Sequence, residues 1–398
     1  MKIALLSIHY PPLKSSCAVQ MRDLALELLQ LGHEPIVMVP EEGLKRKVVS
    51  EMIDGIQVFR FPAFKTIDVG RIKRGLSEIL LPFFMIYGIK KIQLSIKDFD
   101  TVIWYSPTIF FGPVVKFLKR SSNCRSYLIL RDIFPEWAFD LGVLRKGVVY
   151  FLFKLVAKYQ YSVADIIGVQ TPSNLAYLEN WSKKPNRQLE VLENWLSLAP
   201  IKNTQISFIN NHFEGKKIFV YIGNMGVAQG VDIFMELAKI LKNRQDIGFL
   251  FVGRGSESER LKSYAINRKL NNIIFHDEID PVEIPGLLKM CHVGLVALDP
   301  RHKSHNIPGK FLAYMQAGLP VLARVNPDTD LAVLIKKEKV GYAYVGNEVD
   351  ELQGLAEKLI NNEKNLKIMS RNGVSLSSRM FSSSRAAKQI VSSLSKHK

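Results

Sequence analysis

The fold is decided by residues 218–255, IFVYIGNMGVAQGVDIFMELAKILKNRQDIGFLFVGRG. The stretch begins with a short, continuously apolar run, IFVYIG (218–223), which is typical of a strand buried on both faces. A glycine-rich loop, GNMGVAQG (223–230), then opens a helical segment, and a second apolar run, IGFLFVG (247–253), follows it. A strand, a helix and a strand in this order predict a βαβ unit in a parallel sheet.

The same alternation of apolar runs and helical segments extends through the whole chain. The other predicted strands are 2–8, 34–39, 56–61, 101–106, 126–131, 165–170, 188–192, 272–277, 293–298, 320–325 and 341–345. We therefore predict an α/β protein with two doubly wound, Rossmann-like domains that face a central cleft. The expected organisation is a first domain at 1–196, a linker at 197–217, a second domain at 218–375 and a basic helix at 376–398 that returns to the first domain.

The composition supports two folded domains and adds a large positive charge. The chain has 398 residues and is 47% hydrophobic, which is enough for two cores and excludes disorder. Its formal net charge of +17 calls for an anionic partner, but no recognition motif favours nucleic acid. The apolar run at 2–8 is expected to be a strand rather than a signal peptide. With three scattered cysteines and no uncharged stretch of the ~20 residues that span a bilayer, the sequence predicts a cytoplasmic protein.

Much of the positive charge lies in two segments. Residues 71–125 contain ten Lys or Arg against three acidic residues, and residues 364–398 contain eight against none. In the first segment the cations flank an apolar helix too short to span a bilayer, as in interfacial helices, so we expect peripheral binding to the cytoplasmic face of a bacterial inner membrane. A buried helix with charged ends is the alternative. The residues assigned to the membrane are Lys73, Arg74, Phe83, Phe84, Lys90, Lys91, Lys119 and Arg120.

Three loops of the second half are candidates for binding phosphate. The loop at 223–230 joins a strand to a helix, so backbone amides and a positive helix end meet there, although its glycines could simply allow tight packing. Arg254 lies between two glycines at the end of the next strand, where a guanidinium can bind a phosphate. Lys310 falls in the first turn of a helix in HNIPGKFLAYMQAGLPVLA (305–323), an unfavourable place for a cation unless it faces an anion.

In the first half, charged residues follow a strand in LILRDIFPEWAFDLG (128–142). Arg131, Asp132 and Glu136 are therefore candidates for a site, although the first two could simply pair with each other. The loop before Ser16 and Cys17 also leads from a strand into a helix whose N-terminus could receive an anion. We expect no metal site, because the two Asp-x-Asp pairs lie at a strand start and at a helix cap.

Taken in order, these motifs resemble those of retaining glycosyltransferases with the two-Rossmann GT-B fold, of the family 4 type. The resemblance runs through LGHEPIVMV (31–39), RDIFPEW (131–137), VLENW (191–195) and the three loops above. Within that family, the sequence is most similar to bacterial O-antigen and capsule enzymes, including N-acetyl-L-fucosaminyltransferases. The resemblance implies that the donor nucleotide is held by Gly223, Asn224, Gly226, Gln229, Arg254, Gly255, Phe275, Pro308 and Lys310.

The resemblance further implies that the amides of Ser16 and Cys17 meet the donor phosphate or sugar, and that neither a metal nor another cofactor is needed. The chain departs from the family pattern at four places. Where the family usually has a Glu-x7-Glu pair, this chain has His305 and Ala313, and where the family usually has a Lys in the glycine loop, it has Gln229. A His that is common in the family is replaced by Arg131, and the glycine pair of the first loop is replaced by Ser16 and Cys17. Arg254 and Lys310 are then expected to carry more of the diphosphate charge.

The expected reaction is transfer of a sugar from a nucleotide-sugar, a UDP-sugar such as UDP-N-acetylfucosamine, to a lipid-linked polyprenyl-diphosphate saccharide. Asp132 or Glu136 is expected to orient the acceptor hydroxyl, and Arg131 to face a phosphate. Two alternatives stay open at this stage. One is a GT-B UDP-sugar 2-epimerase, and the other is a non-catalytic subunit that binds lipid-linked saccharide.

Overall fold

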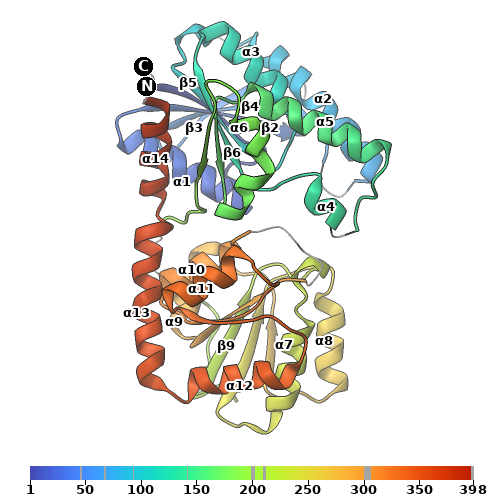
Figure 1. Ribbon diagram of the computed structural model, residues 1–398, viewed down its shortest axis with the longest axis vertical. Coiled ribbons are helices and arrows are strands. Elements are labelled where there is room, and N and C mark those ends of the chain that lie inside the picture. The colour runs from blue at the N-terminus through green and yellow to red at the C-terminus, as the bar shows by residue number, and fades with distance from the viewer. Residues whose placement is uncertain are drawn as a thin grey trace. The chain divides into compact units, whose positions relative to one another are not determined.

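A computed structural model describes residues 1–44, 47–66, 69–92, 94–140, 142–198, 202–208, 212–299 and 306–395. The chain forms two compact units, Met1–Trp195 with Ser383–Lys398, and Leu196–Ser382 (Figure 1). The predicted boundary after residue 375 falls inside a helix, Glu363–Met380, and the chain changes unit after Ser382 instead. The residues expected to form a linker, 197–217, belong to the second unit.

The first unit is built on an eight-stranded sheet of order β3-β4-β2-β1-β5-β6-β7-β8. Its strands are β1 (Lys2–Leu6), β2 (Glu34–Glu42), β3 (Val49–Ile53), β4 (Ile56–Ala63), β5 (Thr101–Ser106), β6 (Arg125–Leu130), β7 (Ile166–Val169) and β8 (Gln188–Val191). Its helices are α1 (Ser16–Gln30), α2 (Arg71–Ile89), α3 (Gly112–Ser122), α4 (Glu136–Asp140), α5 (Val148–Val163), α6 (Glu179–Ser182) and α14 (Ser383–Ser395). All neighbours are parallel except β3 with β4.

The edge strand β3 was not expected from the sequence. Its residues, VSEMI, are mostly exposed and show no buried apolar run, which is the pattern by which the other strands were recognised. It pairs antiparallel with β4 through a turn at Asp54 and Gly55, both of which have positive φ. An edge strand can be polar because only one of its sides is hydrogen bonded and little of it is buried.

The second unit contains a parallel sheet of order β11-β10-β9-β12-β13-β14. Its strands are β9 (Lys217–Ile222), β10 (Ile247–Val252), β11 (Ile273–His276), β12 (Val293–Ala297), β13 (Val321–Arg324) and β14 (Gly341–Tyr344). Its helices are α7 (Asp232–Ile240), α8 (Ser258–Asn267), α9 (Ile284–Lys289), α10 (Gly309–Ala317), α11 (Asp330–Glu338), α12 (Val349–Ile360) and α13 (Glu363–Met380). The predicted doubly wound α/β fold is therefore confirmed in both units.

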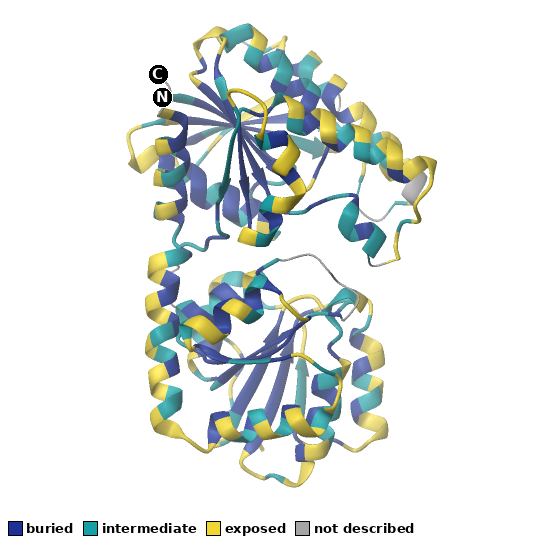
Figure 2. Cartoon of the chain, in the orientation of Figure 1, coloured by how far each residue is buried: buried dark blue, intermediate teal, exposed yellow. Residues whose placement is uncertain are grey.

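Each sheet is covered on both faces, and its strands are buried throughout their middle (Figure 2). In the first unit, α1 and α14 pack on one face and α2 and α3 on the other. In the second unit, α7, α8 and α12 pack on one face, and α9, α10 and α11 on the other. The strand order reverses between β1 and β5 and between β9 and β12, and ligands of such sheets bind beyond the strand ends at these points.

Candidate functional site

The loops that follow β9 and β10 lock together through their backbones. The amide of Gly223 donates to the carbonyl of Val252 at 2.8 Å, and the amide of Met225 donates to the carbonyl of Arg254 at 2.8 Å. A Cβ at Gly253 would lie 2.1 Å from the Gly223 carbonyl oxygen. A Cβ at Gly255 would lie 2.3 Å from that of Met225. Tight packing is therefore a sufficient reason for glycine at both positions of the second loop.

Gln229 organises the first loop from within. Its Oε1 accepts hydrogen bonds from the Gly226 amide at 3.1 Å and from Asn224 Nδ2 at 3.0 Å. The carbonyl of Asn224 in turn accepts from the hydroxyl of Tyr221 at 2.7 Å. The Gly226 amide, which the sequence assigns to phosphate, thus already has a partner. A phosphate at this amide has to displace the Gln229 side chain or share the proton with it.

Lys310 is the cation most closely associated with this loop. It lies in the first turn of α10, after Pro308 at the N-cap, and its Nζ is 3.4 Å from the ring centroid of Tyr221. A Cβ at Gly223 would lie 4.0 Å from the same Nζ. Within the described residues, Nζ is buried and has no hydrogen-bond partner. Burial lowers the pKa of Lys310 well below its ordinary value. A buried, unpaired cation at a positive helix end is unfavourable unless an anion binds beside it.

Two other residues of this unit that were assigned to the donor lie at the surface and against the core. The Arg254 side chain is 83% exposed, and its Nε contacts Glu278 Oε2 at 3.0 Å, so it is held loosely at the surface. The strand end at Phe275 was expected to face the base, which stays a prediction; the Phe275 ring stacks on Phe251 at a centroid distance of 5.2 Å and packs on the core. The exposed residue at this strand end is His276. His305 lies outside the described residues.

A polar cluster that the sequence reading missed ties the first loop to the ends of β12 and β13. The amide of Asp299 donates to the carbonyl of Ala228 at 3.0 Å. Asn326 Nδ2 donates to the carbonyl of Asp299 at 2.9 Å, and Arg324 donates to the carbonyl of Leu298 at 2.5 Å. All three cluster residues, Asp299, Arg324 and Asn326, are buried. Arg254 was identified because it lies at the carboxyl end of a parallel strand, and the same criterion could have identified these three residues.

In the first unit, Arg131 is a structural residue rather than an exposed ligand. It is buried, and it donates to the carbonyls of Leu192 at 2.6 Å and Glu193 at 3.3 Å. Its guanidinium lies 4.5 Å from the centroid of a Trp195 ring. These contacts tie the end of β6 to the segment that follows β8. The expectation that Arg131 faces a phosphate is replaced by this role.

Replacing Arg131 by alanine is expected to lower the free energy of unfolding by about 2 kcal/mol, because two buried carbonyls lose their donor. Urea unfolding measures the change, and Arg120→Ala on the exposed side of α3 is the matched control. Unchanged stability together with lost activity would instead place Arg131 on the substrate.

The two carboxylates after Arg131 are held near the end of β6. Glu136 begins α4, and its Oε1 contacts Lys154 Nζ on α5 at 3.2 Å. Asp132 is partly buried.

The Cys17 thiol is buried 3.2 Å from Ser7 Oγ, and burial raises its pKa to about 11. Cys17 is therefore a neutral packing residue, while Ser16 is exposed at the start of α1.

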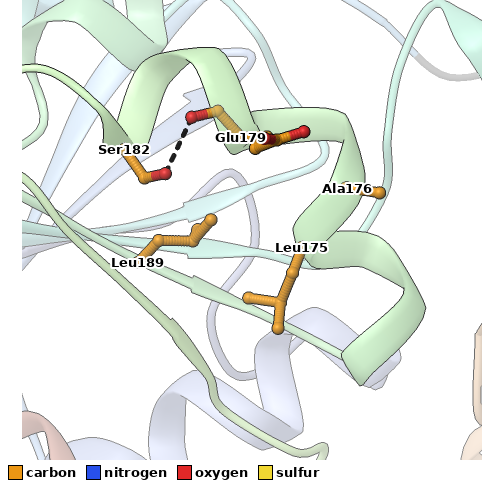
Figure 3. Close-up of a pocket in the computed structure, with 5 residues that line it drawn as sticks. All are labelled: Leu175, Ala176, Glu179, Ser182 and Leu189. Carbon is orange, nitrogen blue, oxygen red and sulfur yellow. Dashed lines mark hydrogen bonds between the residues drawn. The ribbon is translucent and has the colours of Figure 1, made fainter.

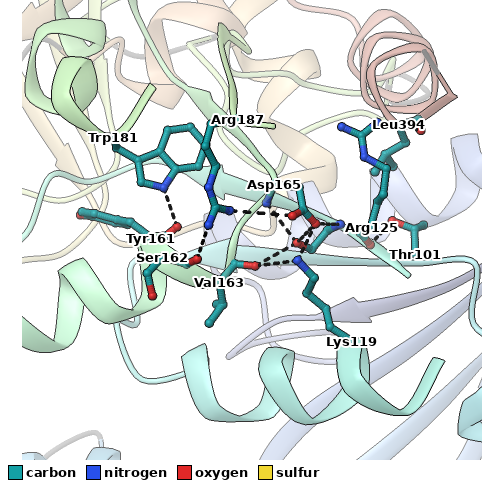
Figure 4. A network of polar contacts seen from close by, with 11 residues as sticks. Thr101, Lys119, Arg125, Tyr161, Ser162, Val163, Asp165, Trp181, Arg187 and Leu394 are labelled. Atoms are coloured by element: carbon teal, nitrogen blue, oxygen red, sulfur yellow. Dashed lines mark hydrogen bonds and ion pairs between the residues drawn. The ribbon is translucent and has the colours of Figure 1, made fainter. Parts of the chain in front are cut away.

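Of the residues assigned to a membrane surface, some are exposed in the structure and others are packed or paired. Lys73, Arg74, Phe83, Lys90, Lys91 and Arg120 are exposed. Phe84 packs edge-on against Phe64, with centroids 5.2 Å apart. Lys119 points inward, where its Nζ contacts Asp165 Oδ2 at 2.5 Å and the carbonyl of Val163 at 3.0 Å (Figure 4). Lys119 is thus part of an internal ion pair and is unavailable to a membrane. The described helices include none that is long and apolar enough to cross a bilayer.

Two surface hollows lie elsewhere in the units. One is lined by Leu175, Ala176, Glu179, Ser182 and Leu189, around α6 and β8 (Figure 3). The other lies at α11, β14 and α13. None of the predicted site residues lines either hollow. In the parts of the chain that the structure describes, no cluster of His, Cys, Asp or Glu is arranged to hold a metal.

Comparisons with known proteins define the class that this fold and site belong to. Residues 202–375 match the family "Glycosyl transferases group 1". The probable glycosyltransferase WbjE of Pseudomonas aeruginosa is 24% identical over 83% of this chain and 82% of its own. WcaI of Escherichia coli K12 is 26% identical over 74% of this chain and 76% of its own, and its name assigns it to colanic acid biosynthesis. These matches confirm the predicted enzyme class, a glycosyltransferase.

Solved structures confirm the GT-B fold. Sucrose-phosphate synthase from Thermosynechococcus elongatus superposes with a TM-score of 0.76 at 16% identity, over 98% of both chains. HepE of Anabaena, solved with UDP-glucose, superposes with a TM-score of 0.71 at 14% identity, over 99% of both chains. The protein is therefore a glycosyltransferase with the GT-B fold; its residues 202–375 are similar to the group 1 family, and the chain is related to enzymes of bacterial surface polysaccharide biosynthesis.

Proposed function

We propose that the enzyme transfers a sugar from a UDP-sugar, with retention of the anomeric configuration, to a saccharide linked to polyprenyl diphosphate during assembly of a bacterial surface polysaccharide. The observation that carries the proposal is the buried Nζ of Lys310 beside the loop after β9, which has no hydrogen-bond partner among the residues that the structure describes. A diphosphate is the anion that suits a lysine, an arginine and a glycine loop placed around two neighbouring strand ends. Further support comes from HepE, solved with UDP-glucose, and from the assignment of WcaI to colanic acid biosynthesis.

The proposed chemistry needs charge stabilisation more than proton transfer on the donor side. As the bond between the sugar C1 and the diphosphate oxygen breaks, negative charge grows on the leaving UDP. Lys310, buried at the N-terminus of α10, and Arg254, at the surface, would stabilise that charge. The new bond joins C1 to the acceptor oxygen; Asp132 or Glu136 would orient the acceptor hydroxyl, and its proton passes to the leaving diphosphate oxygen. No metal or other cofactor has a part in this proposal.

Replacing Arg254 by alanine is expected to weaken binding of UDP-glucose about tenfold without changing the stability, because the side chain is exposed and contacts only a carboxylate at the surface. Isothermal titration measures the affinity. Arg244→Ala, which removes surface ion pairs with Asp246 and Glu357, is the control. Equal affinity of the Arg254 variant and the native protein would remove Arg254 from the donor site.

The reaction itself is tested with a panel of UDP-sugars, beginning with UDP-N-acetylfucosamine and other UDP-amino sugars, and a polyprenyl-diphosphate saccharide. The proposal expects UDP release that requires the acceptor and a product with retained configuration. Interconversion of UDP-sugars without acceptor would instead identify the chain as a UDP-sugar epimerase. Binding of the acceptor without any turnover would identify it as a non-catalytic subunit.

The proposed place of action is the cytoplasmic surface of the inner membrane, where a lipid-linked acceptor is exposed. The excess of cations in residues 71–125 supports it, since basic residues near an anionic leaflet each contribute about 1 kcal/mol to binding. Lys73, Arg74, Lys90, Lys91 and Arg120 are the exposed cations of the predicted set.

A further inference from the structure

Helix α5 has an apolar stripe that faces solvent instead of the core. Its residues Val148, Phe151, Leu152, Leu155 and Tyr159 recur every three or four positions. The first four are 78%, 62%, 56% and 65% exposed. The opposite side of the helix is anchored, since Tyr150, Ala157 and Gln160 are buried. Large side chains aligned in this way on one helix form a patch of the kind that marks an interaction surface.

Helix α2 has a second stripe of the same kind. Leu76, Ile79, Leu80, Phe83 and Tyr87 are all exposed, and they too follow helical spacing. The side chains on the other side of α2, such as Met85 and Ile89, are buried in the core. The sequence reading recognised α2 as interfacial but did not single out α5.

Helix α3 brings the two stripes into one layer of the first unit. It packs against both α2 and α5 (Figure 1). Two contacts show the arrangement: Lys90 Nζ lies 5.6 Å from the ring centroid of Phe117 on α3, and Lys116 on α3 lies 5.6 Å from that of Tyr159 on α5. Both stripes therefore lie on the outside of the same helical layer, and their exposure is visible along α5 and α2 in Figure 2.

The charge around α5 indicates what covers this layer. Residues 141–163 contain four basic side chains and no acidic one. Arg145, Lys146 and Lys158 are exposed, whereas Lys154 pairs with Glu136. Together with the exposed cations near α2, they border the apolar stripes with positive charge. An apolar stripe bordered by cations matches the headgroup region of an anionic bilayer, where apolar side chains reach the acyl boundary and cations meet lipid phosphates.

We propose that α5 and α2 together form the membrane-docking surface of the enzyme, with Phe151 and Leu155 of α5 seated in the headgroup region of an anionic lipid bilayer. The inference rests on the proposed function, because it deepens the expected membrane location by adding a second helix. It also predicts that cations alone do not account for binding, since the stripe of α5 contributes apolar contacts of its own.

The test compares three double variants in co-sedimentation with vesicles of phosphatidylcholine, alone or mixed with phosphatidylglycerol. The native protein is expected to bind the mixed vesicles and to be released by salt. Phe151→Gln with Leu155→Gln, and Arg145→Gln with Lys146→Gln, are each expected to weaken binding about tenfold. The control, Ile266→Gln with Val333→Gln, removes equally exposed apolar side chains from the second unit and is expected to bind like the native protein.

Two results would overturn the proposal. One is binding of the α5 variant to mixed vesicles as strong as that of the native protein. The other is a lipid-free dimer that the α5 substitutions dissociate, which would make the stripe a contact between two copies of the chain. Affinity for UDP-glucose is measured on the same proteins and is expected to be unchanged. Loss of vesicle binding with normal UDP-glucose binding supports the docking surface, whereas absence of sugar transfer by the native enzyme contradicts only the proposed function.

Discussion

Replacing Lys310 by methionine is expected to weaken binding of UDP-glucose about a hundredfold while making the free protein more stable. The affinity falls because the diphosphate loses a charged partner in a buried site, which costs about 3 kcal/mol. The stability rises, by about 1 kcal/mol, because Nζ is buried without a hydrogen-bond partner among the described residues, and an apolar side chain of similar length needs no desolvation. Titration calorimetry and thermal unfolding measure the two effects.

This pair of opposite effects separates a binding role from a structural one. A lysine that merely supported the fold would lower the stability when removed. Lys336→Met, at an exposed position on α11, is the matched control and is expected to change neither property. A Lys310→Met protein that binds UDP-glucose normally would show that the diphosphate lies elsewhere.

The same lysine is expected to make donor binding depend on pH. Burial lowers the pKa of Lys310 in the free enzyme, and a bound diphosphate raises it again, so binding takes up a proton between the two pKa values. The affinity for UDP-glucose is therefore expected to fall as the pH rises through that window. UDP-glucose is the suitable probe because its diphosphate diester does not titrate there. The Lys310→Met variant should show a flatter profile, and a profile identical to that of the native protein would rule out Lys310 as its source.

The free energy of unfolding of the ligand-free protein should rise with pH, whereas the affinity for UDP-glucose falls. Between the lowered pKa of the folded state and the usual lysine pKa, the unfolded chain binds a proton that the folded chain lacks. The free energy of unfolding of the ligand-free protein therefore gains a contribution that rises with pH in this window, and the Met variant lacks it.

Replacing Gly253 by alanine is expected to cost about 3 kcal/mol of stability and to disrupt donor binding. Gly253 has a φ of +141°, which side chains rarely tolerate, and the new Cβ would lie 2.1 Å from the backbone oxygen of Gly223. Neither backbone can move aside cheaply, because the Gly223 amide is bonded to Val252 and the Gly253 amide to the carbonyl of His276 at 3.0 Å. Urea unfolding and UDP-glucose titration measure the two losses.

Gly354→Ala is the matched control for this substitution. Gly354 lies inside α12, and a Cβ there meets nothing within 4 Å, so alanine should stabilise the helix by about 1 kcal/mol. Near-normal stability of Gly253→Ala would mean that the two loops separate easily, and their interlock could then not hold the donor loop in place.

The sequence predicted the sheets well because buried parallel strands have a distinctive pattern. Runs such as IFVYI and IGFLFV are apolar at every position, and both are fully enclosed strands in the structure. The edge strand β3 lacks that pattern, because one of its sides has no neighbouring strand and its residues stay exposed. The pattern thus identified the other described strands of both sheets, including the edge strands β8, β11 and β14, and missed only the polar edge strand β3.

The position of the candidate site stays a prediction from the sequence, and the burial and pairing of its side chains could not be predicted in that way. Arg254, Lys310 and the loop at 223–230 were identified because they follow strands or open helices. Whether each charge is free depends on residues distant in sequence. Arg131 is bonded to the segment after β8, and Lys119 is paired with Asp165, which lies just after the end of α5.

By itself, the sequence determined two doubly wound domains and the strand ends where chemistry can occur, because periodicity and glycine placement are local properties of the chain. Only the tertiary structure decided that Lys310 is buried with no hydrogen-bond partner in the described part of the chain, that Gln229 already holds the Gly226 amide, and that α5 turns an apolar stripe to solvent. Burial and pairing depend on which distant segments meet, and for charged groups these two conditions decide between a structural contact and a binding site.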